Sequence, residues 1–459
     1  MGDVKETRAE LYIGVDVGGT NIQAALVPEC GRIVAREKLS TPRSGSGADT
    51  VAAIETAIKA VLSEHGLKAG DIEAVGLAVP GVTDPTAGRV IVTPNLNLTG
   101  VELVKPLAKR LGVPVALGND TNLGTLGERW LGAGRKASSL FGIFVGTGIG
   151  GGLVRKDKLW RGHRESAGEI GHTVIQCGGP KCACGNFGCL EALAGRWAIE
   201  RDIRDAVKAG RTTVLTELLK GNLRQIRGGA LGQALAAGDA LVTEVLTRVG
   251  EVLGQACITV FHMVDPEMIV LGGGVMEACG DFLLPIVRKA VREHRLPGAR
   301  EGGEVVLSPL GDDAVIVGAV ALARQLAGCD PFDPDFVVLP VYDPVRESGD
   351  GEMTVGDATC RRGAMIRVNG DVKKWQWEPA AGGGGKAATI GPEDVARVCK
   401  GGPHVLFVGT GRDGGLALSE ASQAYLSCRG IGWEALPTPK AIKAYNGHLG
   451  HKAALLHLG

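Results

Sequence analysis

The chain of 459 residues is long enough for two or three folding units, because 44% of its residues are hydrophobic and 22% are charged. Fifty basic residues balance fifty acidic ones without a long basic run, which argues against binding to nucleic acid or to anionic lipid. A polar start, and no apolar run near the ~18 residues of a membrane span, predict a cytoplasmic protein without leader or membrane anchor. Eleven mostly solitary cysteines fit a reducing compartment.

The first predicted element is a β-hairpin with a glycine tip, in residues 11–27 (LYIGVDVGGTNIQAALV). An apolar strand reaches Asp16, and a second apolar run leaves after a turn over residues 18–21. Backbone N–H groups at such a tip can hold phosphate oxygens, and Asp16 could position a metal through water. Taken alone, the stretch also fits an ordinary tight hairpin.

A strand-to-helix junction is predicted next, in residues 113–130. The strand ends at Asn119 and Asp120, and the residues from Thr121 onward are predicted as helix. Ligands collect at the carboxyl ends of strands in α/β sheets. Asp120 could therefore accept the proton of an attacking hydroxyl, with Asn119 fixing a neighbouring hydroxyl. The alternative is that Asp120 only caps the helix.

Residues 138–154 (SSLFGIFVGTGIGGGLV) repeat the glycine-tipped hairpin, which suggests two lobes of similar build. A third strand, 268–275 (MIVLGGGV), leads from its glycines toward a helix, so the three elements could grip a nucleotide. The second segment also fits G-x-G-x-x-G. A strand and a turn are predicted after it rather than a helix, which argues against a dinucleotide-binding motif. A P-loop motif is missing from the sequence.

Three cysteines crowd within eight positions of a glycine-rich loop: Cys182, Cys184 and Cys189. A zinc ion takes four nitrogen or sulfur ligands, so the fourth must be His172 or Cys177. Either choice closes the coordination sphere, so the predicted zinc is structural. Free buried thiols and an iron cluster are the alternatives. A loop held by zinc would fix Glu169 and Glu191, two carboxylates suited to vicinal sugar hydroxyls.

Five motifs, DVGGTN, GNDTNLGTLGE, VGTGIGGG, GEIGH and CACGNFGCLE, resemble in order and spacing the ROK family of sugar kinases and repressors over residues 11–325. The resemblance implies an α/β, two-lobed, actin-like ATPase fold with ribonuclease-H-like halves. The N-terminal lobe is expected at 1–122 and 308–327, and the C-terminal lobe with the zinc loop at 123–307. The implied enzyme is a glucokinase that uses ATP and Mg²⁺, carries structural Zn²⁺, and forms a homodimer or homotetramer.

The resemblance also implies roles for single residues, with Asp120 as the catalytic base. The expected ATP-binding residues are Asp16, Gly18, Gly19, Thr20, Asn21, Gly146, Thr147, Gly148, Gly273 and Gly274. The expected sugar-binding residues are Asn95, Asn119, Asp120, Glu169, His172 and Glu191. The implied zinc ligands are His172, Cys182, Cys184 and Cys189. Leu98 and Thr99 stand where the family often has an aromatic residue.

The motifs leave the sugar open among glucose, fructose, N-acetylglucosamine and N-acetylmannosamine. Polyphosphate is disfavoured as a donor, because family members of that type generally lack the cysteine loop. The family also includes repressors with a DNA-binding module before the first hairpin, but only ten residues precede Leu11. A non-catalytic sugar sensor would be expected to lose Asp120, which is present.

The composition changes beyond residue 325. Residues 328–350, rich in Pro, Asp and Gly, are predicted as a linker, and 351–459 as a small α/β domain with a flexible glycine loop at 380–388. This segment resembles a small domain of unknown function shared with a mitochondrial complex I assembly factor. The resemblance implies a mixed sheet with helices on one side.

Another G-x-G-x-x-G lies in this segment, at Gly409, Gly411 and Gly414, after a predicted strand and before a predicted helix. The chain ends too soon after it for a full dinucleotide-binding sheet, so dinucleotide binding is disfavoured. Trp375 and Trp377 alternate on one strand face and are expected in the core.

Overall fold

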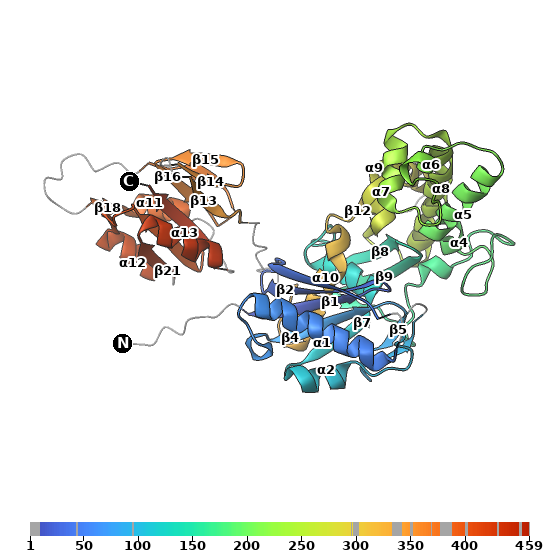
Figure 1. Ribbon diagram of the computed structural model, residues 1–459, viewed down its shortest axis with the longest axis horizontal. Coiled ribbons are helices and arrows are strands. Elements are labelled where there is room, and N and C mark those ends of the chain that lie inside the picture. Colours follow the sequence, from blue (N-terminus) through green and yellow to red (C-terminus); the bar gives the residue numbers. More distant parts are fainter. Residues whose placement is uncertain are drawn as a thin grey trace. The chain divides into compact units, whose positions relative to one another are not determined.

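The fold comes from a computed structural model of the chain (Figure 1). The structure describes residues 10–42, 45–93, 96–294, 296, 303–332, 342–348, 352–368, 370–376, 388–399, 403–428, 431–448 and 452–458. The chain divides into two compact units, one of Leu11–Val27 with Ala35–Pro334 and the other containing the residues from Asp335 onward. No helix in the described part of the chain is long and apolar enough to span a membrane.

The first lobe of the larger unit is built on a five-stranded sheet of order β3-β2-β1-β4-β7. Its strands are β1 (Leu11–Val17), β2 (Asn21–Pro28), β3 (Ala35–Ser40), β4 (Ala74–Val79) and β7 (Val115–Asn119). β1, β4 and β7 are parallel, and β2 and β3 are antiparallel. All of β4 and most of β1 are buried, as is typical of strands covered on both faces.

Helices cover this first sheet. They are α1 (Gly47–Glu64), α2 (Val104–Leu111) and α10 (Ala314–Leu326), with a 3₁₀ turn η1 (Ala69–Asp71) and a small hairpin β5 (Val82–Asp84) and β6 (Arg89–Val92) beside them. α10 packs against β1, β4 and β7, whereas α1 packs against β1 and β3 and lies in front of the sheet in Figure 1. Gly76 in β4 allows this packing, because a Cβ there would lie 1.9 Å from the Ala319 carbonyl oxygen.

The second lobe repeats the strand order of the first. Its sheet, β10-β9-β8-β11-β12, contains β8 (Ser139–Val145), β9 (Ile149–Arg155), β10 (Lys158–Leu159), β11 (Met268–Gly272) and β12 (Glu304–Leu307). β8, β11 and β12 are parallel, while β8–β9 and β9–β10 are antiparallel. In both sheets a hairpin forms one half and two further parallel strands form the other. The prediction of two lobes of similar build is therefore confirmed.

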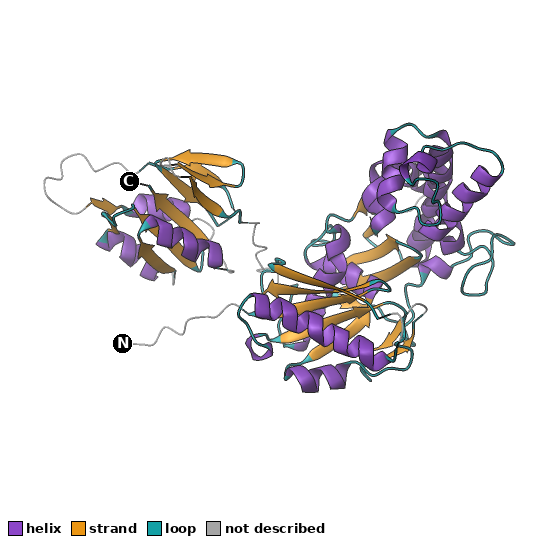
Figure 2. Ribbon diagram, in the orientation of Figure 1, coloured by secondary structure: helices purple, strands orange, loops and turns teal. Residues whose placement is uncertain are grey.

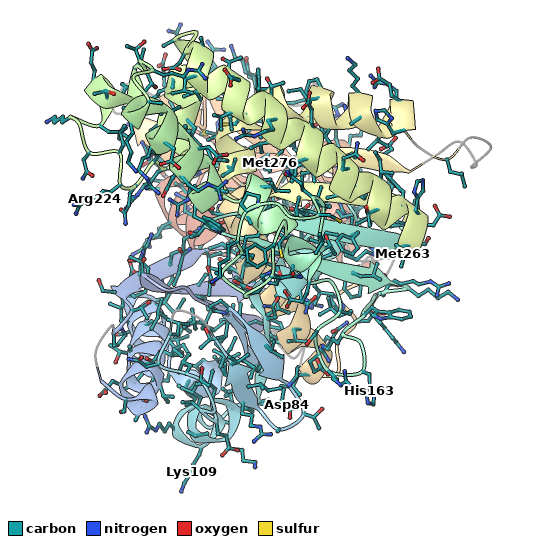
Figure 3. The ribbon with its side chains drawn as sticks, turned by 90° about the vertical axis from the view of Figure 1, so that its right-hand side faces the viewer. Asp84, Lys109, His163, Arg224, Met263 and Met276 are labelled. Carbon is teal, nitrogen blue, oxygen red and sulfur yellow. The ribbon has the colours of Figure 1, made fainter. Side chains whose placement is uncertain are left out.

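The second lobe carries a group of helices beyond its sheet (Figure 2). They are α4 (Leu190–Ala194), α5 (Arg196–Lys208), α6 (Leu215–Leu218), α7 (Gly228–Ala236), α8 (Ala240–Met263) and α9 (Gly274–His294), preceded by the 3₁₀ turn η2 (Ile170–His172). α8 and α9 lie side by side, with Met276 buried and Met263 exposed at the end of α8 (Figure 3). The buried apolar side chains of these helices and of the sheet form one core.

Helix α3 (Asp120–Trp130) joins the two lobes, because it packs against α10 of the first lobe and against β8 and β9 of the second. The expected lobe boundary at residues 122 and 123 thus falls inside one continuous helix. A Cβ at Gly318 of α10 would lie only 1.7 Å from the Leu123 carbonyl oxygen, so the two helices approach at backbone distance. The turn η3 (Gly311–Asp313) leads into α10.

The smaller unit has a mixed five-stranded sheet of order β17-β16-β22-β19-β21. Its elements are β13 (Val345–Ser348), β14 (Glu352–Val355), β15 (Ala358–Arg361), β16 (Gly363–Ile366), β17 (Val372–Lys374), β18 (Ala388–Ile390), α11 (Pro392–Val398), β19 (Val405–Thr410), β20 (Leu416–Leu418), α12 (Glu420–Cys428), β21 (Gly432–Leu436), α13 (Thr438–Gly447) and β22 (Lys452–His457). β13 pairs with β14, so it belongs to this unit although it lies within the expected linker.

Helices cover both faces of this sheet, not one face as expected. Ala454 and Leu456 of β22 belong to one apolar cluster with Tyr445 of α13, while Ala453 and Leu455 belong to another with residues of α11 and α12. The expectation of helices on one side was therefore wrong. The apolar run of β22 is continuous, as is typical of a strand buried on both faces.

Two further predictions for this unit concern its loops and tryptophans. The strand β20 follows Gly414, so the G-x-G-x-x-G of this unit does not open directly into a helix as expected. Trp375 is 5% exposed and belongs to the core, as predicted. Trp377 and nearly all of the glycine loop at 380–388 lie outside the described residues.

Candidate active site

The turn of the first hairpin lies between β1 and β2, as predicted. The Gly18 N–H donates to the Asn21 carbonyl at 2.9 Å, and the Thr41 hydroxyl donates to the Gly18 carbonyl at 2.7 Å. Gly19 and Thr20 at its tip are exposed. Thr41, which follows β3, thus holds one side of the turn, while the tip of the turn is accessible to a ligand.

Asp16 lies at the end of β1, directly before this turn. Burial and, to a lesser degree, the nearby Asp120 and Asp312 carboxylates together raise the pKa of Asp16 to about 7. Three carboxylates from three different segments therefore repel one another here. Such oxygen donors fit a hard divalent cation such as Mg²⁺, which would relieve the repulsion.

The strand-to-helix junction is formed as predicted, with β7 ending at Asn119 and α3 beginning at Asp120. The N-cap is Asn119, whose Oδ1 accepts from the Asn122 N–H at 3.0 Å. Asp120 therefore does not serve as the N-cap, which removes the alternative considered for it. One carboxylate oxygen of Asp120 accepts from the Thr121 N–H at 2.8 Å and from the Asn119 amide at 2.9 Å.

Burial raises the pKa of the Asp120 carboxyl, and the Glu169 carboxylate raises it further, while the hydrogen bonds from Thr121 and Asn119 oppose the rise. The Asn119 amide also donates to the Gly81 carbonyl at 3.0 Å, and its oxygen accepts from the Thr121 hydroxyl at 2.8 Å. Both ends of Asn119 are thus engaged within the protein. A carboxylate held in this way, with a raised pKa, is suited to accept a proton.

The turn of the second hairpin is closed by a hydrogen bond of 2.9 Å from the Gly146 N–H to the Gly148 carbonyl. The Glu191 carboxylate accepts from the Ile149 N–H at 3.0 Å, directly beside this turn. A Cβ at Gly148 would lie 2.1 Å from the nearer Glu191 oxygen, so a larger residue there would displace the Glu191 carboxylate. The turn and the expected sugar ligand Glu191 are therefore in contact.

The glycines after β11 lie against the same turn. Gly273 has a φ of +86°, and a Cβ there would lie 2.7 Å from the Val145 carbonyl oxygen at the end of β8. Gly274 begins α9. The second and third glycine segments thus meet at the ends of neighbouring parallel strands, where nucleotides bind in α/β sheets.

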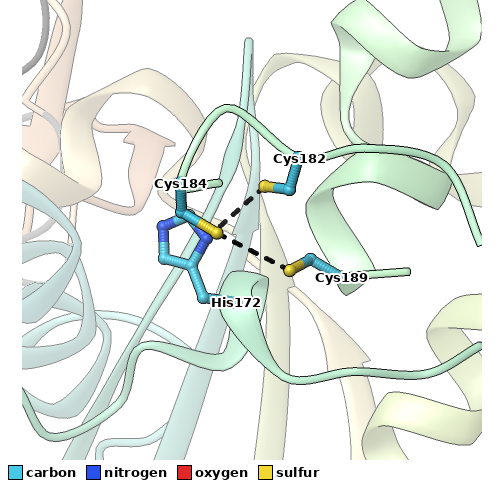
Figure 4. A group of neighbouring side chains, drawn as sticks. All are labelled: His172, Cys182, Cys184 and Cys189. Atoms are coloured by element: carbon cyan, nitrogen blue, oxygen red, sulfur yellow. Dashed lines mark hydrogen bonds between the residues drawn. The ribbon is translucent and has the colours of Figure 1, made fainter. Parts of the chain in front are cut away.

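The cysteine loop forms a compact group of four donors (Figure 4). The group comprises His172, Cys182, Cys184 and Cys189, whose donor atoms all lie within 4.8 Å of one another. The Cys182 sulfur is 3.8 Å from His172 Nδ1, and the Cys184 and Cys189 sulfurs are 3.7 Å apart. Sulfur ligands about 2.3 Å from a tetrahedral zinc would be about 3.8 Å apart. The donor set and spacing fit zinc, and the group includes His172 rather than the exposed Cys177.

The two glutamates expected at the sugar lie between the zinc loop and Asp120. Burial raises the pKa of Glu169, while His172 lowers it and Glu191 raises it. The Cys182 thiol is 3.9 Å from the other Glu191 oxygen. Asp120, Glu169 and Glu191 therefore form one acidic group, joined to the second turn through Glu191. Asn95 lies outside the described residues.

Some residues at the site were not singled out from the sequence. The Thr121 hydroxyl, which donates to Asn119, also lies 3.2 Å from the Gly151 carbonyl oxygen and so joins the start of α3 to β9. Asp312 comes from η3, nearly two hundred residues after Asp120. Arg196, at the start of α5, bonds to Thr147. Thr121 follows the predicted base directly, so its place in the site could have been predicted from the sequence. The sequence around Asp312 and Arg196 carries no motif that would have indicated their place in the site.

The larger unit matches the ROK family model over residues 12–326, and residues 345–456 match a family described as a protein of unknown function (DUF498/DUF598). The chain is 34% identical over 320 residues to a glucokinase of Halalkalibacterium halodurans, covering 68% of this chain and 95% of that protein. It is 35% identical over 317 residues to a glucokinase of Thermotoga maritima, covering 69% and 98%.

Solved structures and repressors also match this region. A ROK family glucokinase from Streptomyces griseus, solved with glucose and AMPPNP, is 34% identical with a TM-score of 0.62, covering 69% of this chain and 99% of that chain. A xylose repressor of Caldicellulosiruptor bescii is 28% identical over 310 residues, covering 68% and 77%. The two-lobed fold is thus that of the actin-like ATPases. Through residues 12–326, with a separate DUF498 domain after them, the chain belongs to the ROK family.

Proposed function

We propose that this protein is an ATP-dependent hexose kinase that phosphorylates the 6-hydroxyl of a hexose, with glucose as the first choice. The observation that carries the proposal is the position of Asp120. It begins α3 beside the acidic group of Glu169 and Glu191, and its charge also acts on Asp16 after β1. A base between a polar sugar site and a phosphate-binding turn is what phosphoryl transfer requires.

In this mechanism the Asp120 carboxylate accepts the proton of the attacking hydroxyl. Glu169, Glu191 and His172 bind the other sugar hydroxyls, and the two glycine turns hold the triphosphate through backbone N–H groups. Glu191 would bind the sugar and also accepts from the Ile149 N–H beside the second turn. It would therefore fix the position of the sugar relative to the ATP phosphates. Bound Mg²⁺ would neutralise phosphate charge near Asp16. ADP and the sugar phosphate are the products.

We also propose that His172, Cys182, Cys184 and Cys189 hold a structural zinc ion. Four protein donors leave no open position for a catalytic water, so the ion would act by fixing the loop. The loop carries Glu191 two residues after Cys189, and Glu169 three residues before His172. A zinc ion held by these four residues would therefore fix the positions of Glu169 and Glu191 without taking part in the reaction.

A coupled ADP-release assay over a panel of hexoses and N-acylated amino-hexoses tests this function. We expect phosphorylation of glucose, and loss of roughly 100-fold or more of kcat in Asp120→Asn, because the base is removed. Asp205→Asn, an exposed carboxylate on α5 that pairs with Lys208, is the matched control and should retain activity. Full turnover by the Asp120 variant would contradict the proposed base.

The repressor relatives make a non-catalytic sugar sensor the second candidate, since they match the same region of the chain. The presence of Asp120 and its raised pKa favour the kinase. Sugar binding by calorimetry without ADP release for any hexose would favour the sensor instead.

A further inference from the structure

Arg196 is the first residue of α5 and touches the turn of the second hairpin. Its Nη2 donates to the Thr147 hydroxyl at 2.6 Å, and its Nη1 donates to the Glu200 carboxylate at 2.6 Å. The backbone joins the same turn, because the Arg196 N–H donates to the Gly146 carbonyl at 3.1 Å and the Trp197 N–H to the Thr147 carbonyl at 3.2 Å. The start of α5 and the turn therefore form one assembly.

The Thr147 side chain is exposed, whereas the Arg196 side chain is only 23% exposed. A hydroxyl that accepts from a guanidinium still has its own proton to donate. The bond to Arg196 therefore turns the Thr147 hydroxyl into a donor toward whatever lies over the turn. Among the described residues, the side chains that accept hydrogen bonds from the Arg196 guanidinium are those of Thr147 and Glu200. A guanidinium has five N–H groups, so Arg196 still has N–H groups that can donate to a ligand.

Charged groups of both signs lie beside this turn, because Glu191 accepts from the Ile149 N–H on it and Arg196 pairs with the buried Glu200. This carboxylate lies between Arg196 and Arg204, whose Nη1 is 3.9 Å from its second oxygen, and it also accepts from the Ile226 N–H. Two guanidinium groups thus share one carboxylate. The positive end of the α5 helix dipole adds to the charge of Arg196 on its side of the turn. A ligand with several negative charges suits such a place better than a neutral sugar.

We infer that Arg196 is a binding residue for the polyphosphate chain of a nucleoside triphosphate at the Gly146–Gly148 turn, acting through its own N–H groups and by orienting the Thr147 hydroxyl. The inference rests on the proposed function, in which this turn holds ATP. Glu200 is the positioning residue that fixes the guanidinium of Arg196. Arg204 pairs with Glu200 from the other side and lies one helical turn beyond Glu200, further from the turn of the hairpin.

The test measures calorimetric dissociation constants for AMPPNP, ADP and adenosine, with Mg²⁺, in the full chain. We expect Arg196→Ala to weaken AMPPNP and ADP by about tenfold to a hundredfold, as for a lost charge-assisted hydrogen bond, and adenosine by less than about twofold. Arg196→Lys should recover part of the loss. Arg204→Ala removes the same charge from the same carboxylate and should change AMPPNP affinity by less than about threefold.

An unchanged AMPPNP affinity in Arg196→Ala would overturn the inference, and so would an equal loss for adenosine, which would indicate a merely structural role. If that variant does not fold, Thr147→Val, at an exposed position, replaces it; it should weaken AMPPNP but not adenosine. The outcomes separate the two proposals. A wild-type protein that phosphorylates no hexose but shows the Arg196 effect refutes the kinase alone, whereas an active kinase without the effect refutes only this inference.

Discussion

Replacing Asn119 by serine separates two roles of this residue, helix capping and support of Asp120. Serine is as good an N-cap as asparagine, so the acceptor for the Asn122 N–H is kept. Serine is too short to replace the amide donations to Asp120 at 2.9 Å and to Gly81 at 3.0 Å. The change therefore removes one hydrogen bond that favours the ionised form of Asp120, the proposed base.

The size of the effect follows from that one bond. A hydrogen bond to a charged group contributes ~1.5–3 kcal/mol, and Asp120 keeps the bond from the Thr121 N–H, so the lower end of this range is expected. About 1.4 kcal/mol corresponds to a tenfold change in an equilibrium constant. Because the bond from Asn119 lowers the pKa of Asp120, its loss raises that pKa. The acid limb of kcat/KM should move to higher pH by about one pH unit.

The assay is the pH profile of kcat/KM for the sugar, which reports the free enzyme. Urea unfolding should show a loss of about 1 kcal/mol for the unpaired Gly81 carbonyl. Asn119→Ala is the companion variant, since it also removes the cap and should cost about 1 kcal/mol more. A folded Asn119→Ser protein with an unmoved acid limb would refute the reasoning. A raised KM for the sugar with an unmoved limb would instead favour Asn119 as a sugar ligand.

Three further predictions concern metals and packing. Cys189→Ser should lose the bound zinc, measured by atomic absorption, and raise the KM for the sugar; full zinc content would contradict the assigned ligands. Mg²⁺–ATP affinity should fall about tenfold per pH unit below about 7, because protonated Asp16 cannot attract a cation, and Asp16→Asn should abolish this dependence. Gly318→Ala should lower the free energy of unfolding in urea by ~3 kcal/mol or more, because its Cβ would meet the Leu123 carbonyl. The control is Gly229→Ala, at a helical site with open space around it, which should raise that free energy by about 0.5 kcal/mol.

The elements of the larger unit could be predicted where apolar runs and glycines mark them. Both hairpins, the junction at Asn119 and the strand before Gly273 are present as predicted. The cap could not be predicted, because Asn and Asp are both favoured at that position and only the local geometry decides between them. The hydrogen bond from Ile149 to Glu191 and the effect of the Asp312 charge on Asp16 each join segments that are far apart in the chain. Residue spacing carries no information about such contacts.

The smaller unit was harder to predict because its elements are short. Its α/β character agrees with the prediction, but β13 lies within the expected linker, and the arrangement of the elements does not follow from the sequence. The continuous apolar run in β22 already indicated burial on both faces, and that signal favours helices on each side of the sheet. The expectation of a one-sided cover came from resemblance, and the residue pattern contradicts it.

The glycines of the VGTGIGGG motif serve two different purposes, because some shape the turn and others let α3 lie close to β9. Gly146 and Gly148 shape the turn itself. Gly150 and Gly152 lie further along β9, where a Cβ would come within 2.4 Å of the Thr121 side chain and 2.6 Å of the Thr125 hydroxyl. Side chains at these positions would push α3 off the sheet. Because α3 begins with Asp120, the proposed base, a larger residue at either glycine would move this carboxylate away from the Gly146–Gly148 turn, which is proposed to hold the triphosphate.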